Sequence, residues 1–402
     1  MKKEIKKVSA RKILDSRGNW TVEVKLETSF GEFLASVPSG ASKGKYEAKT
    51  LKVEEAVKTI NKIISSRLKK ENVLNQEKID KFLNPQKFGS NVTLPASLAV
   101  CRAGAKAKDM PLFFYIRELF GRGKRSFRMP LPAFNIINGG VHAGNDLDFQ
   151  EFMVVFQKRS FLKNLELAVK FYRKLKEIIS QKYSLLATNL GDEGGFAPPL
   201  KRPEEALDLI EKTANVLGCQ KELKIILDVA SSQFYKKNVY QTKLGPLKRK
   251  KLADYYFNLI KRYPILGIED PFAEDDWLGW KEFRAKLKKQ KAKVLIIGDD
   301  LLATNPKRIK RAKLKEACDG AIIKMNQIGT ISKTIEAAKL AKSFGWKIIV
   351  SHRSGETTDD FISDLAVGIG ADFIKAGAPA RGERVAKYNR LLEIENELNK
   401  PL

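Results

Sequence analysis

Three carboxylates stand where short apolar runs of the chain end. Asp228 follows the run LKIIL, Glu269 follows PILGI, and Asp299 follows VLIIG. Runs of this length and composition predict strands that are buried on both faces. Because the carboxyl ends of parallel strands gather at one end of a barrel, we expect the three side chains to converge. Converging carboxylates completed by water suit Mg²⁺, whereas each Asp alone could instead cap the helix that follows it.

Three further apolar runs end in basic and hydroxyl side chains. Lys324 follows AII, Lys375 follows DFI, and the run WKIIV is followed by SHRS, Ser351 to Ser354. A Lys beside a divalent cation has a lowered pKa and suits the role of a base, although it could also simply neutralise the carboxylates. Arg353 and Ser354 offer a guanidinium and a hydroxyl to a phosphate or carboxylate, unless Arg353 forms an ordinary surface ion pair.

Gly-rich and polar loops carry the remaining candidates. The chain has two histidines, and both fall in such loops: His142 in NGGVHAG and His352 in SHRS. Glu193 lies in GDEGGFAP, and Gln150 and Glu151 precede a buried run. Each histidine could be structural or could line a site. With the lysines and the two glutamates, these groups could remove a proton next to a carboxylate and protonate a leaving group.

The elements that must position these residues follow a repeating order. The strand ends recur about every 30 residues, which is the length of one βα unit. The segments between them, such as Ser332 to Lys342, have helical periodicity. Ordered β-then-α alternation predicts a parallel sheet, and the converging polar ends favour a closed α/β barrel. We assign residues 126–402 to this catalytic domain.

Residues 1–125 have the pattern of an α+β domain. Runs starting at Val8, Trp20 and Phe33 predict antiparallel strands, and helical patterns follow at 53–70, 75–83 and 93–108. The segment Gly121 to Ser126 is typical of a linker. The small polar loop from Val37 to Lys45, which contains Ser39, is either a plain turn or a lid whose oxygen atoms bind a hard cation.

Composition excludes some classes of protein and leaves one question open. No apolar run approaches the roughly 20 residues of a membrane span, and the basic N-terminus lacks the apolar segment of a secretory signal. The three cysteines are odd in number and widely separated, which is typical of free thiols in a reducing cytoplasm. The net charge of +28 reflects either lysines on solvated helix faces or a polyanionic partner such as RNA or anionic lipid.

These motifs closely resemble those of enolases (phosphopyruvate hydratases), nearly from end to end. In chain order they are DSRGN at Asp15, PSGAS at Pro38, NGGVHAG at Asn138, QEFM at Gln150, GDEGGFAP at Gly191, EDPFAEDDW at Glu269, KMNQIGT at Lys324, SHRSGET at Ser351 and RVAKYN at Arg384. The resemblance implies an α+β cap followed by a ββαα(βα)6 barrel, whose first strands depart from the regular βα order. It also implies a homodimer or a larger homo-oligomer.

The resemblance further implies a reaction and the residues that perform it. The reaction is the Mg²⁺-dependent, reversible dehydration of 2-phosphoglycerate to phosphoenolpyruvate. Asp228, Glu269 and Asp299 would hold one Mg²⁺, and Ser39 would help to hold a second. Lys324 would take the proton from C2, and Glu193, supported by Glu151, would protonate the departing C3 hydroxyl. Lys375 would bind the carboxylate, Arg353 and Ser354 the phosphate, and Gln150, His142 and His352 would line the site.

The chain departs from the usual enolase pattern in places. Lys43 replaces a usual Thr, Trp20 replaces a usual Pro, and enolases are commonly acidic. Two other hypotheses therefore stay open. One is an enolase-like protein whose main role is to bind RNA or another polyanion. The other is a related dehydratase acting on a different acid, against which the complete motif from Ser351 to Glu356 argues.

Overall fold

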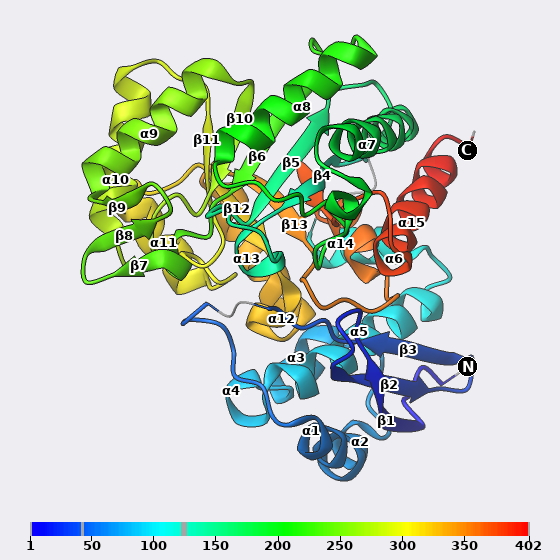
Figure 1. The fold of residues 1–402 in the computed structure, drawn as a ribbon. Coiled ribbons are helices and arrows are strands. Elements are labelled where there is room, and N and C mark those ends of the chain that lie inside the picture. The colour runs from blue at the N-terminus through cyan, green and yellow to red at the C-terminus, as the bar shows by residue number, and fades with distance from the viewer. Residues whose placement is uncertain (1, 42–43, 122–126, 401–402) are drawn as a thin grey trace.

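The computed structural model describes residues 2–41, 44–121 and 127–400. A smaller N-terminal part, blue and cyan in Figure 1, lies against one side of a larger barrel. Helix α12 (Met325–Ile328) lies where the two parts meet. Most of the expected linker, residues 122–126, lies outside the described residues, as do Ser42 and Lys43 of the expected lid.

The expected antiparallel strands of the N-terminal part are confirmed. Strands β1 (Lys7–Leu14), β2 (Trp20–Glu27) and β3 (Glu32–Ser36) pair in that order. Asp15 closes the β1–β2 turn, because its Oδ1 accepts the backbone N–H groups of Arg17 and Asn19, each at 2.9 Å. Gly18 adopts φ +75° in this turn, a conformation that favours glycine.

The helices of the N-terminal part complete the α+β domain. They are α1 (Val53–Thr59), a π-helical segment (Ile60–Ile64), α2 (Ser65–Leu68), α3 (Gln76–Phe82), α4 (Pro85–Phe88), α5 (Ser90–Ala107) and α6 (Leu112–Leu119). The first three follow one another without a break, which confirms the helix expected over 53–70. Helix α6, which packs on α14 (Phe361–Gly368) of the barrel, was not anticipated.

Among the described residues, eight strands close into a barrel. They are β4 (Leu131–Asn138), β5 (Glu151–Phe156), β6 (Leu223–Asp228), β10 (Ile265–Glu269), β11 (Leu295–Gly298), β12 (Gly320–Ile323), β13 (Lys347–Ser351) and β14 (Phe373–Lys375). Strand β5 runs antiparallel to both of its neighbours, and the other pairs are parallel. Helices α7 (Phe161–Lys182) and α8 (Pro203–Leu217) both follow β5, so the ββαα(βα)6 order is confirmed.

The outer helices alternate with the later strands. They are α9 (Arg249–Arg262), α10 (Trp277–Lys289), α11 (Pro306–Leu314), α13 (Ile331–Ser343), α14 and α15 (Gly382–Leu398). A small antiparallel sheet, β7 (Tyr235–Lys236), β8 (Val239–Thr242) and β9 (Gly245–Leu247), lies between β6 and α9. This sheet was not anticipated. It explains why the interval from Asp228 to Glu269 is the longest of the intervals between successive polar strand ends.

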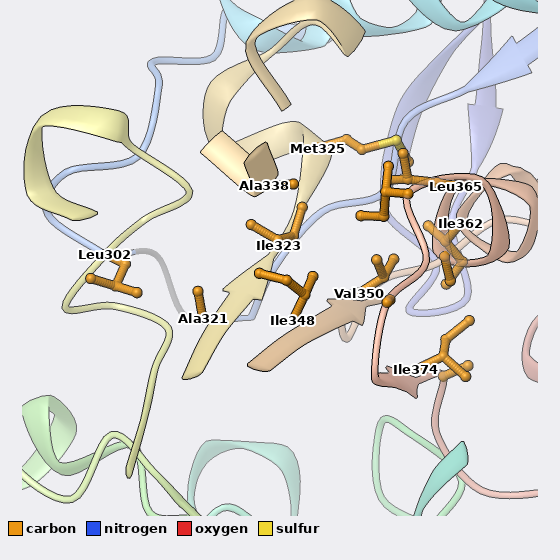
Figure 2. Close-up of a cluster of buried hydrophobic side chains, with 14 of the residues drawn as sticks. Leu302, Ala321, Ile323, Met325, Ala338, Ile348, Val350, Ile362, Leu365 and Ile374 are labelled. Atoms are coloured by element: carbon orange, nitrogen blue, oxygen red, sulfur yellow. The ribbon is translucent and has the colours of Figure 1, made fainter. Parts of the chain in front are cut away.

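Alternation along each strand divides the apolar side chains between two cores. Ile226, Ile297, Ile322, Ile349 and Phe373 belong to the core inside the barrel. Their neighbours face the helices: Figure 2 shows Ala321, Ile323, Ile348, Val350 and Ile374 beside Ala338, Ile362 and Leu365 of α13 and α14. Burial on both faces holds the strand ends rigidly in place. Among the described residues, no helix combines the length and apolar character that crossing a membrane requires.

Candidate active site

The polar strand ends converge at the carboxyl-terminal mouth of the barrel. Asp228, Glu269 and Lys375 are the last residues of β6, β10 and β14, and Asp299 and Lys324 directly follow β11 and β12. All five side chains are buried. The convergence predicted from the strand spacing is therefore confirmed.

Lys375 lies at the centre of a carboxylate cluster. Its Nζ is 3.0 Å from Asp228 Oδ2, 3.1 Å from both oxygens of Glu269 and 2.9 Å from Glu151 Oε2. Adjacent strands impose this geometry, because Asp228 pairs in register with Glu269 on one side and with Glu151 on the other. Burial alone would lower the pKa of Lys375, but the surrounding carboxylates raise it well above its usual value.

Lys324 forms a second buried ion pair, with Asp299 Oδ2. The other oxygen of that carboxylate accepts a 3.0 Å hydrogen bond from Gln327 Nε2. Burial lowers the pKa of Lys324, but Asp299 outweighs burial and the pKa is raised. The lowered pKa expected from the sequence assumed a divalent cation nearby; with the carboxylates alone the direction is opposite.

The donor set at the mouth fits divalent metal. Burial and the negative charge of neighbouring carboxylates raise the pKa of Glu269 and Asp270 well above usual values and that of Asp300 to about 8. Carboxylate oxygens of Asp270, Asp299 and Asp300 approach within 4.8 Å of one another. A crowd of buried carboxylates that repel one another is stabilised by a hard cation. Asp299 belongs both to this group and to the predicted ligand set of Asp228, Glu269 and Asp299, which stays a prediction.

Arg384 determines the protonation of His352. Arg384 Nη1 lies 2.6 Å from His352 Nδ1, and His352 Nε2 lies 3.0 Å from Glu193 Oε2. A guanidinium can only donate, so Nδ1 accepts and Nε2 carries the proton toward Glu193. Asn135 Nδ2 donates to the same glutamate oxygen at 3.0 Å. His352 is fully enclosed, and its pKa is lowered to about 3, by burial first and also by Arg384.

Glu151 and Glu193 form an acid pair around His142. The Nδ1 atom of His142 is 3.6 Å from Glu151 Oε1 and 3.7 Å from Glu193 Oε1. Burial and the charge of Glu193 raise the pKa of Glu151 well above its usual value. Burial also acts to raise the pKa of Glu193, but the two histidines overcome it and the pKa is well below the usual value. The site therefore shifts the pKa values of the two carboxyl groups in opposite directions, upward for Glu151 and downward for Glu193.

Arg353 and Ser354 lie in the loop after β13 and contact the N-terminal part of the chain. Arg353 makes a bidentate ion pair with Glu47, at 2.9 and 3.0 Å. Ser354 Oγ accepts the backbone N–H of Ala41 at 2.5 Å. Among the described residues, His142 Nδ1 and Gln150 Oε1 are buried without a hydrogen-bond partner, so both could receive a ligand.

Ser39 lies at the junction of the two parts but is engaged elsewhere. Its hydroxyl donates to Asp15 Oδ2 at 2.7 Å, and its backbone exchanges two hydrogen bonds with Gly355. Its role as a metal ligand therefore stays a prediction. The next serine of the same loop, Ser42, lies outside the described residues.

Comparison with known families agrees with this geometry. The family described as Enolase, C-terminal TIM barrel domain, matches residues 126–401, and the family described as Enolase, N-terminal domain, matches residues 5–116. The chain belongs to the enolase family. Enolases bind small-molecule substrates and use Mg²⁺, which the carboxylate cluster of this chain suits.

Several residues of this enolase-family site escaped the sequence analysis. Glu47 and Asn135 bind site residues directly, yet neither ends an apolar run. Gln327 lies inside the motif KMNQIGT, which marked its position without giving it a role. Arg384 opens the motif RVAKYN, so the resemblance marked its position without giving it a role. Its burial and its contacts with His352 and with the backbone oxygens of Arg353 and Ser354 now supply one.

Proposed function

We propose that this enolase-family protein is a carbon–oxygen lyase that converts 2-phosphoglycerate reversibly to phosphoenolpyruvate. The observation that carries the proposal is one buried site in which two lysines, the glutamate pair Glu151 and Glu193, and an arginine meet. That combination matches the four tasks of the reaction: removing a proton, binding a carboxylate, protonating a leaving hydroxyl and holding a phosphate. A cytoplasmic location and homo-oligomerisation belong to the same proposal.

Each task is assigned to a residue with suitable chemistry. Lys324 takes the proton from C2, for which its ammonium must first lose a proton and its hold on Asp299 must weaken. Lys375 receives the substrate carboxylate, because it stays charged among the acids. The Glu151–Glu193 pair supplies the proton for the C3 hydroxyl, and His352 and Asn135 orient Glu193. Gln150 and His142 line the site, and Arg353 with Ser354 holds the phosphate.

Mg²⁺ fits this site through Asp228, Glu269 and Asp299, with a second ion assigned to the loop of Ser39. When bound, it supplies positive charge that favours the negative charge developing on the substrate carboxylate. The protein residues then align the substrate and keep water away.

The test is product formation followed by ultraviolet absorbance. We expect 2-phosphoglycerate to yield phosphoenolpyruvate only with Mg²⁺, and Lys324→Ala to abolish the reaction while remaining folded. Lys315→Ala, at an exposed position directly after α11, serves as the matched control and retains activity. Absence of product from the folded, Mg²⁺-loaded protein would reject the proposal; activity on acids without a phosphate would point to another dehydratase, and salt-sensitive RNA binding alone to a polyanion-binding protein.

A further inference from the structure

Glu47 forms an ion pair with Arg353, the residue to which the proposed function assigns the substrate phosphate. Its two carboxylate oxygens accept hydrogen bonds from Arg353 Nη1 and Nη2 at 2.9 and 3.0 Å. The side chains of Arg353 and Glu47 are only 4% and 9% exposed. A parallel, two-bond carboxylate–guanidinium contact uses the same planar geometry by which arginine binds phosphate.

Burial explains why the arginine has such a partner. A guanidinium enclosed without an anion is strongly unfavourable, so a protein that keeps one for a ligand must balance it when the ligand is absent. Glu47 supplies that balance from a segment more than 300 residues away in the chain. A neighbouring ion pair between the two parts, Lys45 with Asp275, is by contrast largely exposed and contributes little.

The segment around Glu47 is held on both sides. Tyr46 Oη donates to Asp275 Oδ1 at 2.6 Å, and the Arg308 guanidinium lies 3.5 Å from the centre of the Tyr46 ring. On the other side, Ala48 N donates to Gln327 O at 2.9 Å. These contacts do not involve the Glu47 carboxylate, which accepts one further hydrogen bond, from Gly44 N–H of the same segment at 3.1 Å. The side chain can therefore leave Arg353 while the backbone stays docked.

Space is available for that movement. A cavity of about 290 Å³ is lined by Glu47, Ala48, Asn326 and residues of the β2 and Ser39 regions. Because Glu47 lines this cavity, its carboxylate can turn toward it and be hydrated there. We propose that Glu47 is an internal anion that competes with the substrate phosphate for Arg353 and thereby sets the affinity of Arg353 for phosphate. This inference rests on the proposed function.

The competition follows from charge as well as from shape. A phosphate dianion on Arg353 meets the negative charge of Glu47 within a few ångströms, in a poorly solvated site where charges are weakly screened. Either the carboxylate moves away or the two anions repel each other. In both cases removing the charge of Glu47 strengthens phosphate binding, and an anion with less charge than phosphate displaces Glu47 less effectively.

The experiment measures the affinity of inorganic phosphate by calorimetry, with the full-length protein and constant Mg²⁺. Glu47→Gln keeps the shape and removes the charge, and we expect at least fivefold tighter binding. Glu47→Asp keeps the charge but shortens the reach, and we expect an affinity between those of wild type and Glu47→Gln. Asp275→Asn is the matched control: it loosens the same segment through Tyr46 without touching Arg353, and we expect less than a twofold change.

Unchanged or weaker phosphate binding in the folded Glu47→Gln variant overturns the proposal, because Glu47 would then orient Arg353 for phosphate. If Glu47→Gln does not fold, Glu47→Asp decides in its place, and unchanged or weaker binding in that variant overturns the proposal. Phosphate binding that survives Arg353→Met also overturns it, since the anion would bind elsewhere. These outcomes do not depend on turnover of 2-phosphoglycerate, whose absence in the wild type would reject the proposed function instead.

Discussion

His352 has a defined tautomer in this site, and that tautomer can be observed. Because Arg384 donates to Nδ1, nitrogen NMR of the two histidines should show His352 protonated at Nε2 at neutral pH. His142→Asn assigns the remaining signal. A proton on Nδ1 would contradict the arrangement around Arg384.

The same histidine predicts how stability depends on pH. Its pKa in the folded chain, about 3, is far below the value of about 6.5 in an unfolded chain. Between these pH values His352 is protonated in the unfolded chain but neutral in the folded chain. The stabilisation provided by the neutral, buried His352 is therefore complete above pH 6.5 and is lost as the pH falls toward 3. Urea unfolding of wild type should show that slope, and His352→Gln should reduce it.

Gln327 is predicted to position a metal ligand. Its amide donates to Asp299, and its oxygen accepts the Thr304 hydroxyl at 2.6 Å. Partners that orient a ligand typically affect metal affinity 10- to 100-fold, so Gln327→Leu should weaken Mn²⁺ binding by about tenfold or more in an electron paramagnetic resonance titration. Gln290→Leu, at an exposed helix end, is the control. Equal Mn²⁺ affinity in the two variants would show that Asp299 needs no such support.

At the residue scale, sequence reasoning found the side chains that end strands and missed those that contact them from elsewhere. Asp228, Glu269 and Lys375 were identifiable because an apolar run stops abruptly at each one. Glu47 and Gln327 lie in a loop and a short helix, where a polar residue is ordinary. Only the folded chain brings Glu47 to Arg353, so no local pattern could have indicated the pair.

At the scale of elements, Gly355 joins the loop after β13 to the segment of Ser39. A Cβ atom at this position would lie 2.6 Å from both Asp15 Oδ2 and Ser39 Oγ and 2.9 Å from Ser39 O. Gly355→Ala should therefore separate the two backbones, lower stability by about 1–3 kcal/mol and raise KM. Gly144→Ala, where a Cβ would meet nothing within 4 Å, is the control for calorimetry and kinetics. Full stability in Gly355→Ala would mean that the junction adjusts freely.

The regular elements were predictable because their burial is regular. Each later barrel strand is apolar on both faces, so both its position and its end are visible in the sequence. The β7–β9 sheet was not, because strands of two to four residues carry almost no periodic signal. The antiparallel direction of β5 was not predicted, since the resemblance implied only the ββαα order of the first elements. Strand direction follows from packing and connections rather than from composition.

At the scale of the whole molecule, an ion pair joins the N-terminal part to the barrel. Arg102 of α5 binds both oxygens of Asp359, at 2.8 and 2.9 Å, and Asp359 also accepts the N–H of Ser36 at 3.1 Å. Removing one partner of a largely buried pair typically costs about 3 kcal/mol, so Asp359→Asn should lower the unfolding free energy by about that amount at pH 7. Asp360→Asn, whose side chain is 39% exposed, should have a smaller effect.

Acid should remove the contribution that Asp359 makes to the unfolding free energy. Burial acts to raise the pKa of this carboxyl, but Arg102 overcomes burial and holds the pKa below its usual value. Its contribution is therefore present above about pH 4, the unfolded pKa, and is lost as the pH falls through the lower folded value. The stability difference between wild type and Asp359→Asn should shrink below pH 4; a constant difference would show that the carboxylate charge is not involved.

The net charge of +28 makes the protein sensitive to ionic strength as a whole. Several lysines of α10 and the loop after it, Lys288, Lys289, Lys291 and Lys293, are exposed and follow one another closely. Charges of one sign repel over about 30 Å at 0.01 M salt but only about 10 Å at 0.1 M. Self-repulsion destabilises the compact state, so NaCl should raise Tm by about 3 °C over this range.

Sucrose at equal osmolality separates screening from solvent exclusion, and sulfate is avoided because Arg353 could bind it. A Tm that falls with NaCl would show that the attractive ion pairs, including Arg102–Asp359, outweigh the repulsion of the surplus lysines.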